Sequence, residues 1–276
     1  MALILITHTW NDELYLPHWL KHHKRLFDHG VIICYDTQDS TLEIIKTLVP
    51  DWDIVKPTKK IFEAVSCDEQ IQYIESKFPA DWKCCMTCTE FIATDNLREK
   101  IALFEAEHPD KIGFFFSGWG LVDTSEQRQS VLDKNTPLLL QRQHGFDMRV
   151  DSTNFSGRNF GKRFFHKTLH GSYVAGRHFT NHDENTYIEM HDKLKLIRCF
   201  YSPFNEKGKA RKLRMKDNIS EHDKENGLCF QHLMSEQEME EDYVRHLKIS
   251  YDLLTREEYR NDIADMYGIN KWKFLE

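Results

Sequence analysis

The chain has 276 residues, of which 40% are hydrophobic, 12% aromatic and 29% charged. This apolar content excludes a disordered chain, which lacks the area that offsets the entropy of ordering, and 12 Gly with 7 Pro exclude a collagen-like or low-complexity chain. With 37 basic and 44 acidic residues the net charge is -7, so nucleic acid is not an expected partner and any polyanion site must be local.

The sequence carries no signal for a membrane or an oxidising compartment. No apolar run approaches the ~20 residues that cross a bilayer, and the apolar start at 1–6 has no basic residue before it. Seven cysteines, an odd number in a long chain, indicate free thiols. We therefore expect a cytoplasmic protein without a transmembrane segment.

The first 35 residues predict a strand, a helix and a second strand. Residues 2–7 and 31–35 are almost wholly apolar runs, typical of strands buried on both faces. Between them, residues 11–26 carry apolar side chains at helical intervals, with Asn11 or Asp12 available as a cap. A crossover of this kind is right-handed and joins parallel strands.

The pattern repeats through residue 116. We expect helices at 41–48 and 67–78, and strands at 53–55, 83–87 (running on to 89–92) and 112–116. This alternation predicts an α/β fold with a mostly parallel, doubly wound sheet that is flanked by helices and binds ligands at the carboxyl ends of its strands.

The second half of the sequence has a different residue pattern. Residues 121–180 are irregular and predict loops with short strands, and 205–227 form the most polar stretch. From 235 to 259 a helical period returns, with Tyr243, Leu247 and Tyr251 on one face. We therefore divide the chain into a first unit at 1–232 and a helical C-terminal extension at 233–276 that packs on the same domain.

Five motifs, in order, resemble those of GT-A fold glycosyltransferases of the family-2-like and family-92-like groups, most closely over residues 3–180. These are Asn11-Asp12-Glu13-Leu14-Tyr15-Leu16-Pro17-His18-Trp19 with His22-His23, Asp36 with Asp39-Ser40-Thr41, Thr87-Cys88-Thr89-Glu90-Phe91, Phe116-Ser117-Gly118-Trp119-Gly120, and Gly161-Lys162-Arg163 with Gly176-Arg177-His178. The resemblance implies a GT-A-like sheet, a nucleotide-sugar donor and transfer of the sugar, usually with inversion, to a hydroxyl of a glycan or polysaccharide acceptor.

The sequence departs from this family where the family binds its metal. Members hold Mn²⁺ or Mg²⁺ through two Asp of a D-x-D motif, and those positions are Thr87 and Thr89 here, followed by Glu90. Neutral hydroxyls are poor ligands for hard cations. His18 also replaces a family Glu. We therefore predict no metal site and no cofactor besides the donor substrate.

A basic segment offers a replacement for the metal. Six cations fall within ten residues, at Lys207, Lys209, Arg211, Lys212, Arg214 and Lys216. The diphosphate leaving group gains negative charge as the sugar bond breaks, so positive groups stabilise it. We predict that Lys207, Arg211 and Arg214 from a closing loop bind the diphosphate, with His178 donating to a phosphate oxygen. A solvated surface run is the alternative.

The remaining roles follow from the expected strand ends. Thr7 and Thr9 after the first strand, and Asp36 after the second, are predicted to contact the donor nucleoside. Thr87, Thr89 and Glu90 are also predicted to bind the donor. Asp123 is the predicted general base with Asp183 as its competitor. An ordinary surface carboxylate is the alternative for each.

Trp119, flanked by glycines at a strand end, is the predicted platform for an acceptor sugar. Other patterns have plainer interpretations. Cys85 and Cys88 form a C-x-x-C without a second copy, which favours buried thiols over zinc, and His18 with His22 favours packing over metal binding.

Two other functions stay open from the sequence. The lost carboxylates fit a catalytically inactive protein that binds a glycan or nucleotide without turnover. A nucleotidyltransferase is less favoured, because neither metal-binding carboxylates nor a Gly-rich basic loop follows the first strand.

Overall fold

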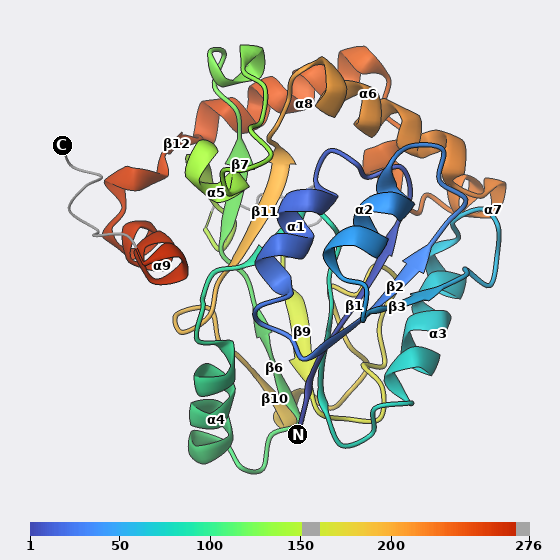
Figure 1. The fold of residues 1–276 in the computed structure, drawn as a ribbon, viewed down its shortest axis with the longest axis vertical. Helices are drawn as coiled ribbons and strands as arrows, with labels where there is room; N and C mark the ends of the chain where they lie inside the picture. Colours follow the sequence, from blue (N-terminus) through green and yellow to red (C-terminus); the bar gives the residue numbers. More distant parts are fainter. Residues whose placement is uncertain (151–160, 269–276) are drawn as a thin grey trace.

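The computed structural model describes residues 1–150 and 161–268. The strands of its larger sheet come mainly from the N-terminal half of the chain (Figure 1). Within these residues the sheet order is β10-β6-β9-β4-β1-β2-β3, and every strand runs parallel to β1 except β9. The strands are β1 (Leu3–Thr9), β2 (His29–Cys34), β3 (Asp53–Val55), β4 (Trp82–Cys85), β6 (Gly113–Phe116), β9 (Arg163–His166) and β10 (Tyr187–Glu189).

A second sheet, absent from the sequence prediction, contains strands from both halves of the chain. Its order is β12-β8-β7-β11-β5, in which β7 and β11 are parallel neighbours and the other pairs are antiparallel. The strands are β5 (Glu90–Ile92), β7 (Trp119–Val122), β8 (His144–Asp147), β11 (Leu196–Tyr201) and β12 (Tyr251–Asp252). The run expected to continue from 83 to 92 is thus divided between two sheets.

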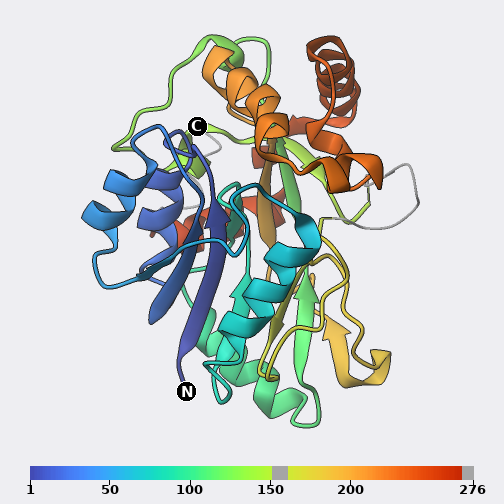
Figure 2. The ribbon, with the colours of Figure 1, turned by 90° about the vertical axis from the view of Figure 1, so that its right-hand side faces the viewer.

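Helices cover both faces of the larger sheet (Figure 2). They are α1 (Leu16–His23), α2 (Thr41–Leu48), α3 (Ala64–Glu75), α4 (Leu97–Glu107), α5 (Leu138–Gln141), α6 (Glu206–Arg214), α7 (Glu221–Glu225), α8 (Glu236–Ile249) and α9 (Glu257–Tyr267). The main apolar core includes side chains of α1, α2, α4, α8 and α9, whereas α3 packs in a second core on the opposite face. None of these helices combines the length and apolarity that a bilayer span requires.

The α/β fold class, with a mostly parallel sheet flanked by helices, is confirmed, and several element boundaries are corrected. The first helix starts at Leu16 rather than near 11, because Pro17 stands in its first turn and the preceding residues form turns that position side chains at the end of β1. The helix α4 had not been predicted.

The polar segment at 205–227 is not the predicted loop. It forms α6, a 3-10 turn at Met215–Asn218 and α7, and the side chains of Asn205 and Ser220 cap the two helices. The expected helix at 235–259 also divides, because α8 ends at Ile249 and the short β12 precedes α9. Tyr243 is buried as expected, and so are Tyr259 and Ile263 on α9.

Buried histidines give the fold a dependence on pH. His22 on α1 is 5% exposed, and its Nε2 lies 2.8 Å from the carbonyl oxygen of Ile92. Its Nδ1 has no hydrogen-bond partner among the described residues. Burial lowers the pKa of His22 from 6.5 to about 3, so the native protein excludes a proton that the unfolded chain accepts.

Replacing His22 by Gln reduces the acid sensitivity of the protein. A lowered folded pKa contributes stability above pH 6.5 that is lost as the pH falls toward 3, at about 1.4 kcal/mol per pH unit for one group. Urea unfolding of His22→Gln between pH 4 and 6 will show a shallower loss of stability by roughly that amount. An unchanged slope, with the exposed variant His222→Gln as control, would contradict this assignment.

Candidate functional site

The site lies where the carboxyl ends of β1 and β4 meet. The chain continues from β1 to β2 on one side and reaches β4 on the other, so this is the point where the strand order reverses. Thr7 Oγ1 lies 3.8 Å from Cys88 Sγ, which joins the two strand ends. Thr9 donates a hydrogen bond of 2.8 Å to Asp12 Oδ2. Both threonines are buried, so they support the edge rather than present an open hydroxyl.

Helix α6 brings Arg211 and Arg214 to this edge. Arg211 Nε donates to Asp12 Oδ1 at 2.6 Å, and its guanidinium lies 4.9 Å from the ring centroid of Tyr15. Arg214 is exposed, donates to the carbonyl of Asn11 at 3.4 Å and lies over Trp10. The basic segment is therefore held at the carboxyl edge and not on the far side of the molecule.

A second pair of arginines meets at Glu90. Glu90 is fully buried and accepts a hydrogen bond of 2.8 Å from Arg163 Nε and another of 2.8 Å from the backbone N–H of Thr87. Arg198 Nε lies 3.8 Å from its other oxygen. Arg163 reaches this edge because β9 runs antiparallel to its neighbours, so the first residue of β9 pairs with Phe116 at the end of β6.

A fifth arginine, Arg177, connects α3 with β1. Its guanidinium is paired with Asp68 of α3, and Nη2 donates to His8 Nε2 at 3.1 Å. His8 must therefore carry its ring proton on Nδ1 when neutral. Arg177 has a positive φ of 63°, an uncommon backbone conformation for a residue other than Gly. The loop after β9 thus delivers a buried guanidinium to the end of β1.

We call the set brought together here the basic cluster: Arg163, Arg177, Arg198, Arg211, Lys212 and Arg214. Burial and the positive charge of the cluster lower the pKa values of three partly buried histidines. Burial, and then the charges of Arg177, Arg163, His232 and Arg211, hold the pKa of His8 well below 6.5. Burial and the charges of Arg163, Arg198 and Arg177 do the same for the pKa of His178.

The pKa of the third histidine, His232, is affected by burial and then most by the cations that α6 contributes to the cluster. Burial, with Lys212, Arg211 and Arg198, lowers its pKa to about 3. One compact field thus acts on side chains from β1, the loop after β9, and the 3-10 turn at Phe230–His232. Three carboxylates, Asp12, Asp68 and Glu90, face the five guanidinium groups of the cluster, which leaves a positive excess suited to a phosphate group.

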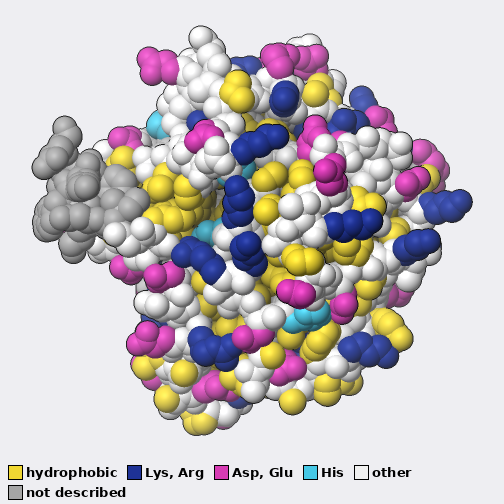
Figure 3. Space-filling model, viewed as in Figure 1, with side chains coloured by type: hydrophobic (Ala, Val, Ile, Leu, Met, Phe, Trp, Pro, Cys, Tyr) yellow, Lys and Arg dark blue, Asp and Glu magenta, His cyan; other side chains and the backbone are white. Residues whose placement is uncertain are grey.

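Basic side chains also gather on a neighbouring surface. Figure 3 shows Lys and Arg across the middle of the face covered by α1 and α2. Lys21, in the last turn of α1, is exposed there and donates to the carbonyl of Lys134 at 2.9 Å. The net charge of -7 is therefore unevenly spread over the protein.

Two predicted phosphate ligands differ in placement. His178 is partly buried, and its Nδ1 lies 3.3 Å from Arg163 Nη1, inside the basic cluster. Lys207 is an exposed residue in the first turn of α6, four positions before Arg211 and seven before Arg214, the arginines that reach the edge. The structure thus brings His178, Arg211 and Arg214 together and leaves Lys207 on the surface.

The threonine motif does not offer a metal site. Thr87 Oγ1 and Thr89 Oγ1 lie 3.1 Å apart, and Glu90, which follows Thr89 in the chain, is engaged by Arg163. No group of three His, Cys, Asp or Glu that could hold a metal ion occurs in residues 1–150 and 161–268. The residues present therefore do not fit the divalent cation that the family resemblance implies.

Asp36 lies beside this edge, after β2, and is exposed. Its carbonyl accepts a hydrogen bond of 3.2 Å from Trp10 Nε1, which places the indole next to the loop. The carboxylate of Asp36 therefore faces solvent near the end of β1, where the sequence predicted a nucleoside contact.

Both predicted general bases are corrected. Asp123 is fully buried, accepts the N–H of Phe204 at 2.9 Å and lies 3.2 Å from Arg142 Nε, so no acceptor hydroxyl can reach it in this structure. Burial raises the pKa of this carboxyl. Asp183 is exposed, but it precedes β10 at the amino end of the parallel strands. At that end the backbone N–H of Ile112 donates a hydrogen bond to the carbonyl oxygen of Thr186. Asp183 thus lies at the edge opposite the basic cluster.

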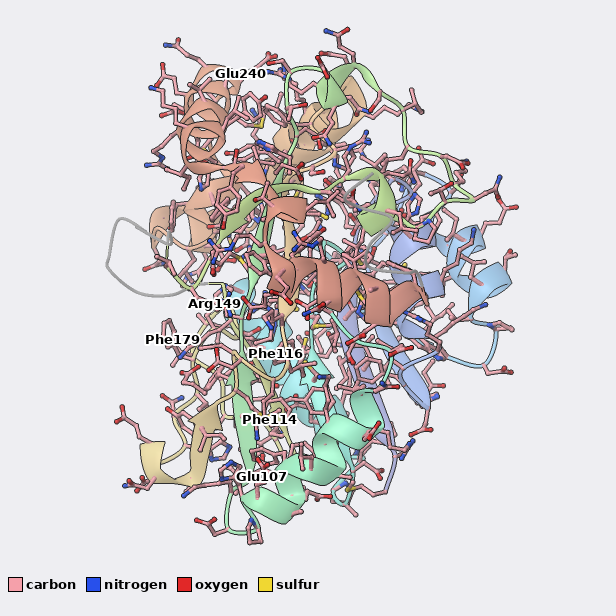
Figure 4. All side chains as sticks on the ribbon, turned by 90° about the vertical axis from the view of Figure 1, so that its left-hand side faces the viewer. Glu107, Phe114, Phe116, Arg149, Phe179 and Glu240 are labelled. Carbon is pink, nitrogen blue, oxygen red and sulfur yellow. The ribbon has the colours of Figure 1, made fainter. Side chains whose placement is uncertain are left out.

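Trp119 is not the predicted acceptor platform, because its side chain is fully buried. Its Nε1 donates to Asp262 at 3.4 Å, and Tyr259 packs edge-on at 5.7 Å. Arg149, labelled beside the start of α9 in Figure 4, lies over the indole and pairs with Glu258. Helix α9 covers the face that stacking on a sugar requires.

Four members of the cluster had no predicted phosphate role. Arg163 and Arg177 stood inside the last of the quoted motifs and Lys212 in the basic segment, so their positions there were usable signals. Arg198 carried no such signal, because only the pairing of β11 with β5 brings it to this edge. Cys85 and Cys88 are buried free thiols, as the plainer interpretation expected.

No protein-family model matches the sequence, and no curated protein matches it. Among solved structures, the chain resembles a 4-diphosphocytidyl-2C-methyl-D-erythritol synthase at 12% identity and TM-score 0.27, over 48% of this chain and 68% of that one. It also resembles HddC from Yersinia pseudotuberculosis at 11% identity and TM-score 0.35, over 72% of this chain and 93% of that one. The glycosyltransferase resemblance therefore remains a prediction.

Removing Arg163 will destabilise the protein strongly. Arg163→Met leaves the carboxylate of Glu90 buried without its main partner, which costs about 3–5 kcal/mol. Arg98→Met is the matched control, since its pair with Asp28 is exposed and contributes about 0–1 kcal/mol. Chemical unfolding measures both. Equal losses for the two variants would show that the Glu90 pair does not support the site.

Proposed function

We propose that the protein binds the diphosphate of a nucleotide sugar at the basic cluster and transfers the sugar to a hydroxyl of a glycan without a divalent metal. One observation supports this proposal above the others. Guanidinium groups converge near the two threonines that occupy the expected metal-binding positions, and they come from β9, β11, α6 and the loop after β9. A diphosphate is a dianion with several acceptor oxygens, and arginines offer paired donors to such groups.

The chemistry required of this site is stabilisation of charge. When the acceptor oxygen attacks the anomeric carbon, the bond from that carbon to the phosphate oxygen breaks and its electron pair stays on the phosphate. The acceptor proton passes to a base. Fixed cations near the phosphate lower the barrier without the reorganisation that water would need. Arg211 and Arg214 fit this role, because α6 holds them at the edge while Arg214 remains open to solvent.

The second candidate is a protein that binds the same ligand without turnover. It is favoured by a specific observation: of the two carboxylates predicted as general base, Asp123 is sealed inside the protein and Asp183 lies at the opposite edge. Binding and turnover therefore require separate tests.

Nucleotide sugars will raise the melting temperature in EDTA. A ligand at 100 times its dissociation constant stabilises the native state by about 2.7 kcal/mol, roughly several degrees for a chain of this size. The screen uses UDP-, GDP-, ADP- and dTDP-glucose with the matching nucleosides, each with EDTA or Mn²⁺. A shift that appears only with Mn²⁺ would contradict metal-free binding.

Two variants locate the phosphate in the same screen. Arg211→Ala combined with Arg214→Ala will reduce the shift produced by a nucleotide sugar more than the shift produced by its nucleoside. Arg214→Ala alone preserves the pair of Arg211 with Asp12 and guards against a general loss of folding. Lys216→Ala, an exposed lysine just after α6, is the control and keeps the full shift. Equal losses for both ligand classes would exclude this phosphate assignment.

Turnover is measured with the nucleotide sugar that gives the largest shift. A glycosyltransferase commonly hydrolyses its donor slowly, so release of nucleoside diphosphate in EDTA is the expected result, with a loss of about tenfold or more for Arg214→Ala, as for a charged contact worth about 1.4 kcal/mol in the transition state. Binding without any release, even with added glycans, would favour the non-catalytic candidate.

A further inference from the structure

Lys212 contacts a backbone carbonyl and an aromatic ring in the basic cluster. Its Nζ donates to the carbonyl of Phe200 at 2.9 Å and lies 4.3 Å from the ring centroid of Tyr201. Among the described residues no carboxylate comes within ion-pair distance of it, whereas Lys209 on the same helix pairs with Glu236 and Glu240. Lys212 is thus a partly buried amine beside a carbonyl and an aromatic ring.

The charged and titratable groups that face Lys212 come from four elements. They are Arg211 on α6, Arg198, Cys199 and Tyr201 on β11, His232 in the 3-10 turn at Phe230–His232, and Asp242 and His246 on α8. The carboxylate of Asp242 favours the ammonium form, but it is bound by Tyr201 and Arg245. Arg211 and Arg198 oppose that form, so positive charge dominates around the amine.

Burial, and then Arg211 and Arg198, lower the pKa of Lys212 to about 7. The arginines of the cluster stay charged at any physiological pH. His232, with a pKa of about 3, stays neutral there. Within the part of the chain that the structure describes, Lys212 is therefore the member of the cluster that is about half protonated near pH 7.

We propose that Lys212 takes up a proton when an anion enters the basic cluster, so that the site binds a diphosphate together with one proton. The proton moves from solvent to Nζ, an amine becomes an ammonium, and no bond of the ligand changes. This proposal rests on the assignment of the cluster as the diphosphate site. It gives the empty site less internal repulsion and the occupied site one more cation.

The physical reason is the field of the bound dianion. A negative group within several ångströms of an amine stabilises its ammonium form, and the same two arginines that disfavour this form in the empty site are then neutralised by the ligand. Proton uptake follows from linkage: where the occupied site holds more protons than the empty site, affinity falls as the pH rises. The fall continues until the pH passes the pKa of Lys212 in the complex.

The test measures protons bound per ligand by titration calorimetry at pH 8, in two buffers of different ionisation enthalpy. The probe is the nucleotide sugar with the largest thermal shift, whose diphosphate diester keeps its charge throughout this pH range. The expected uptake approaches one proton, and affinity falls by up to about tenfold per pH unit between pH 7 and 9.

Variants assign this uptake to one side chain. Lys212→Arg carries a permanent cation, so it will bind at pH 8 without proton uptake and with little pH dependence. Lys212→Met will also show no uptake, with an affinity near that of the natural protein at high pH. Lys209→Arg, a conservative change at a lysine paired with Glu240, is the matched control and keeps the uptake. Uptake that survives in Lys212→Arg would overturn the proposal.

A second probe separates this inference from the proposed function. Inorganic sulfate remains a dianion across the range and needs only the cations. Sulfate that binds with Lys212-dependent uptake while no nucleotide sugar binds would support the proton linkage and overturn the donor assignment. Nucleotide sugars that bind without uptake would do the reverse. Failure of both probes to bind would overturn both.

A direct titration requires no ligand. In protein labelled with ¹³C-lysine, the signal that disappears in Lys212→Arg reports the ionisation of this amine. A midpoint near 7 that rises on adding sulfate is expected, and a midpoint near 10.5, the ordinary value for lysine, would overturn the proposal.

Discussion

The site depends on pairing three buried carboxylates with three of the guanidinium groups that crowd one edge of the sheet. Two like charges about 6 Å apart repel by roughly 3 kcal/mol at the effective dielectric of a protein. Asp12, Asp68 and Glu90 offset this repulsion and are bound by Arg211, Arg177 and Arg163 respectively. Each carboxylate comes from an element of the N-terminal half, so these pairs also fix the later segments on the sheet.

Two features of the sequence act in the same direction at this edge. The threonines at 87 and 89 place no negative charge there, and the later arginines add positive charge. Under the proposed function a diphosphate gains from both features, since fewer anions repel it and more donors face it. Lys212 differs from the arginines because its charge changes near neutral pH. Its environment leaves the amine near its titration point, whereas guanidinium groups stay charged.

The residues predicted for the acceptor are placed differently from this edge. Trp119 and Asp123 lie in the second sheet or directly after one of its strands, and both are enclosed by the C-terminal half of the chain. Trp119 contacts α9, and Asp123 contacts Arg142 and the segment before α6. Asp123 follows a strand end as predicted, but Trp119 begins β7 rather than following the strand before it, and the covering segments make both residues supports for the fold. The basic cluster is thus the part of the site that the geometry supports.

The sequence by itself determined the α/β class, the buried strands at the start of the chain and the basic segment carrying Arg211 and Arg214, because apolar runs and charge density are local properties. Only the tertiary structure decided that this segment is a helix held by Asp12, that Trp119 is covered, and that Arg163 and Arg198 meet at Glu90. Those contacts join residues up to 199 positions apart. They depend on the reversed direction of β9 and on a second sheet, neither of which a local pattern of side chains can reveal.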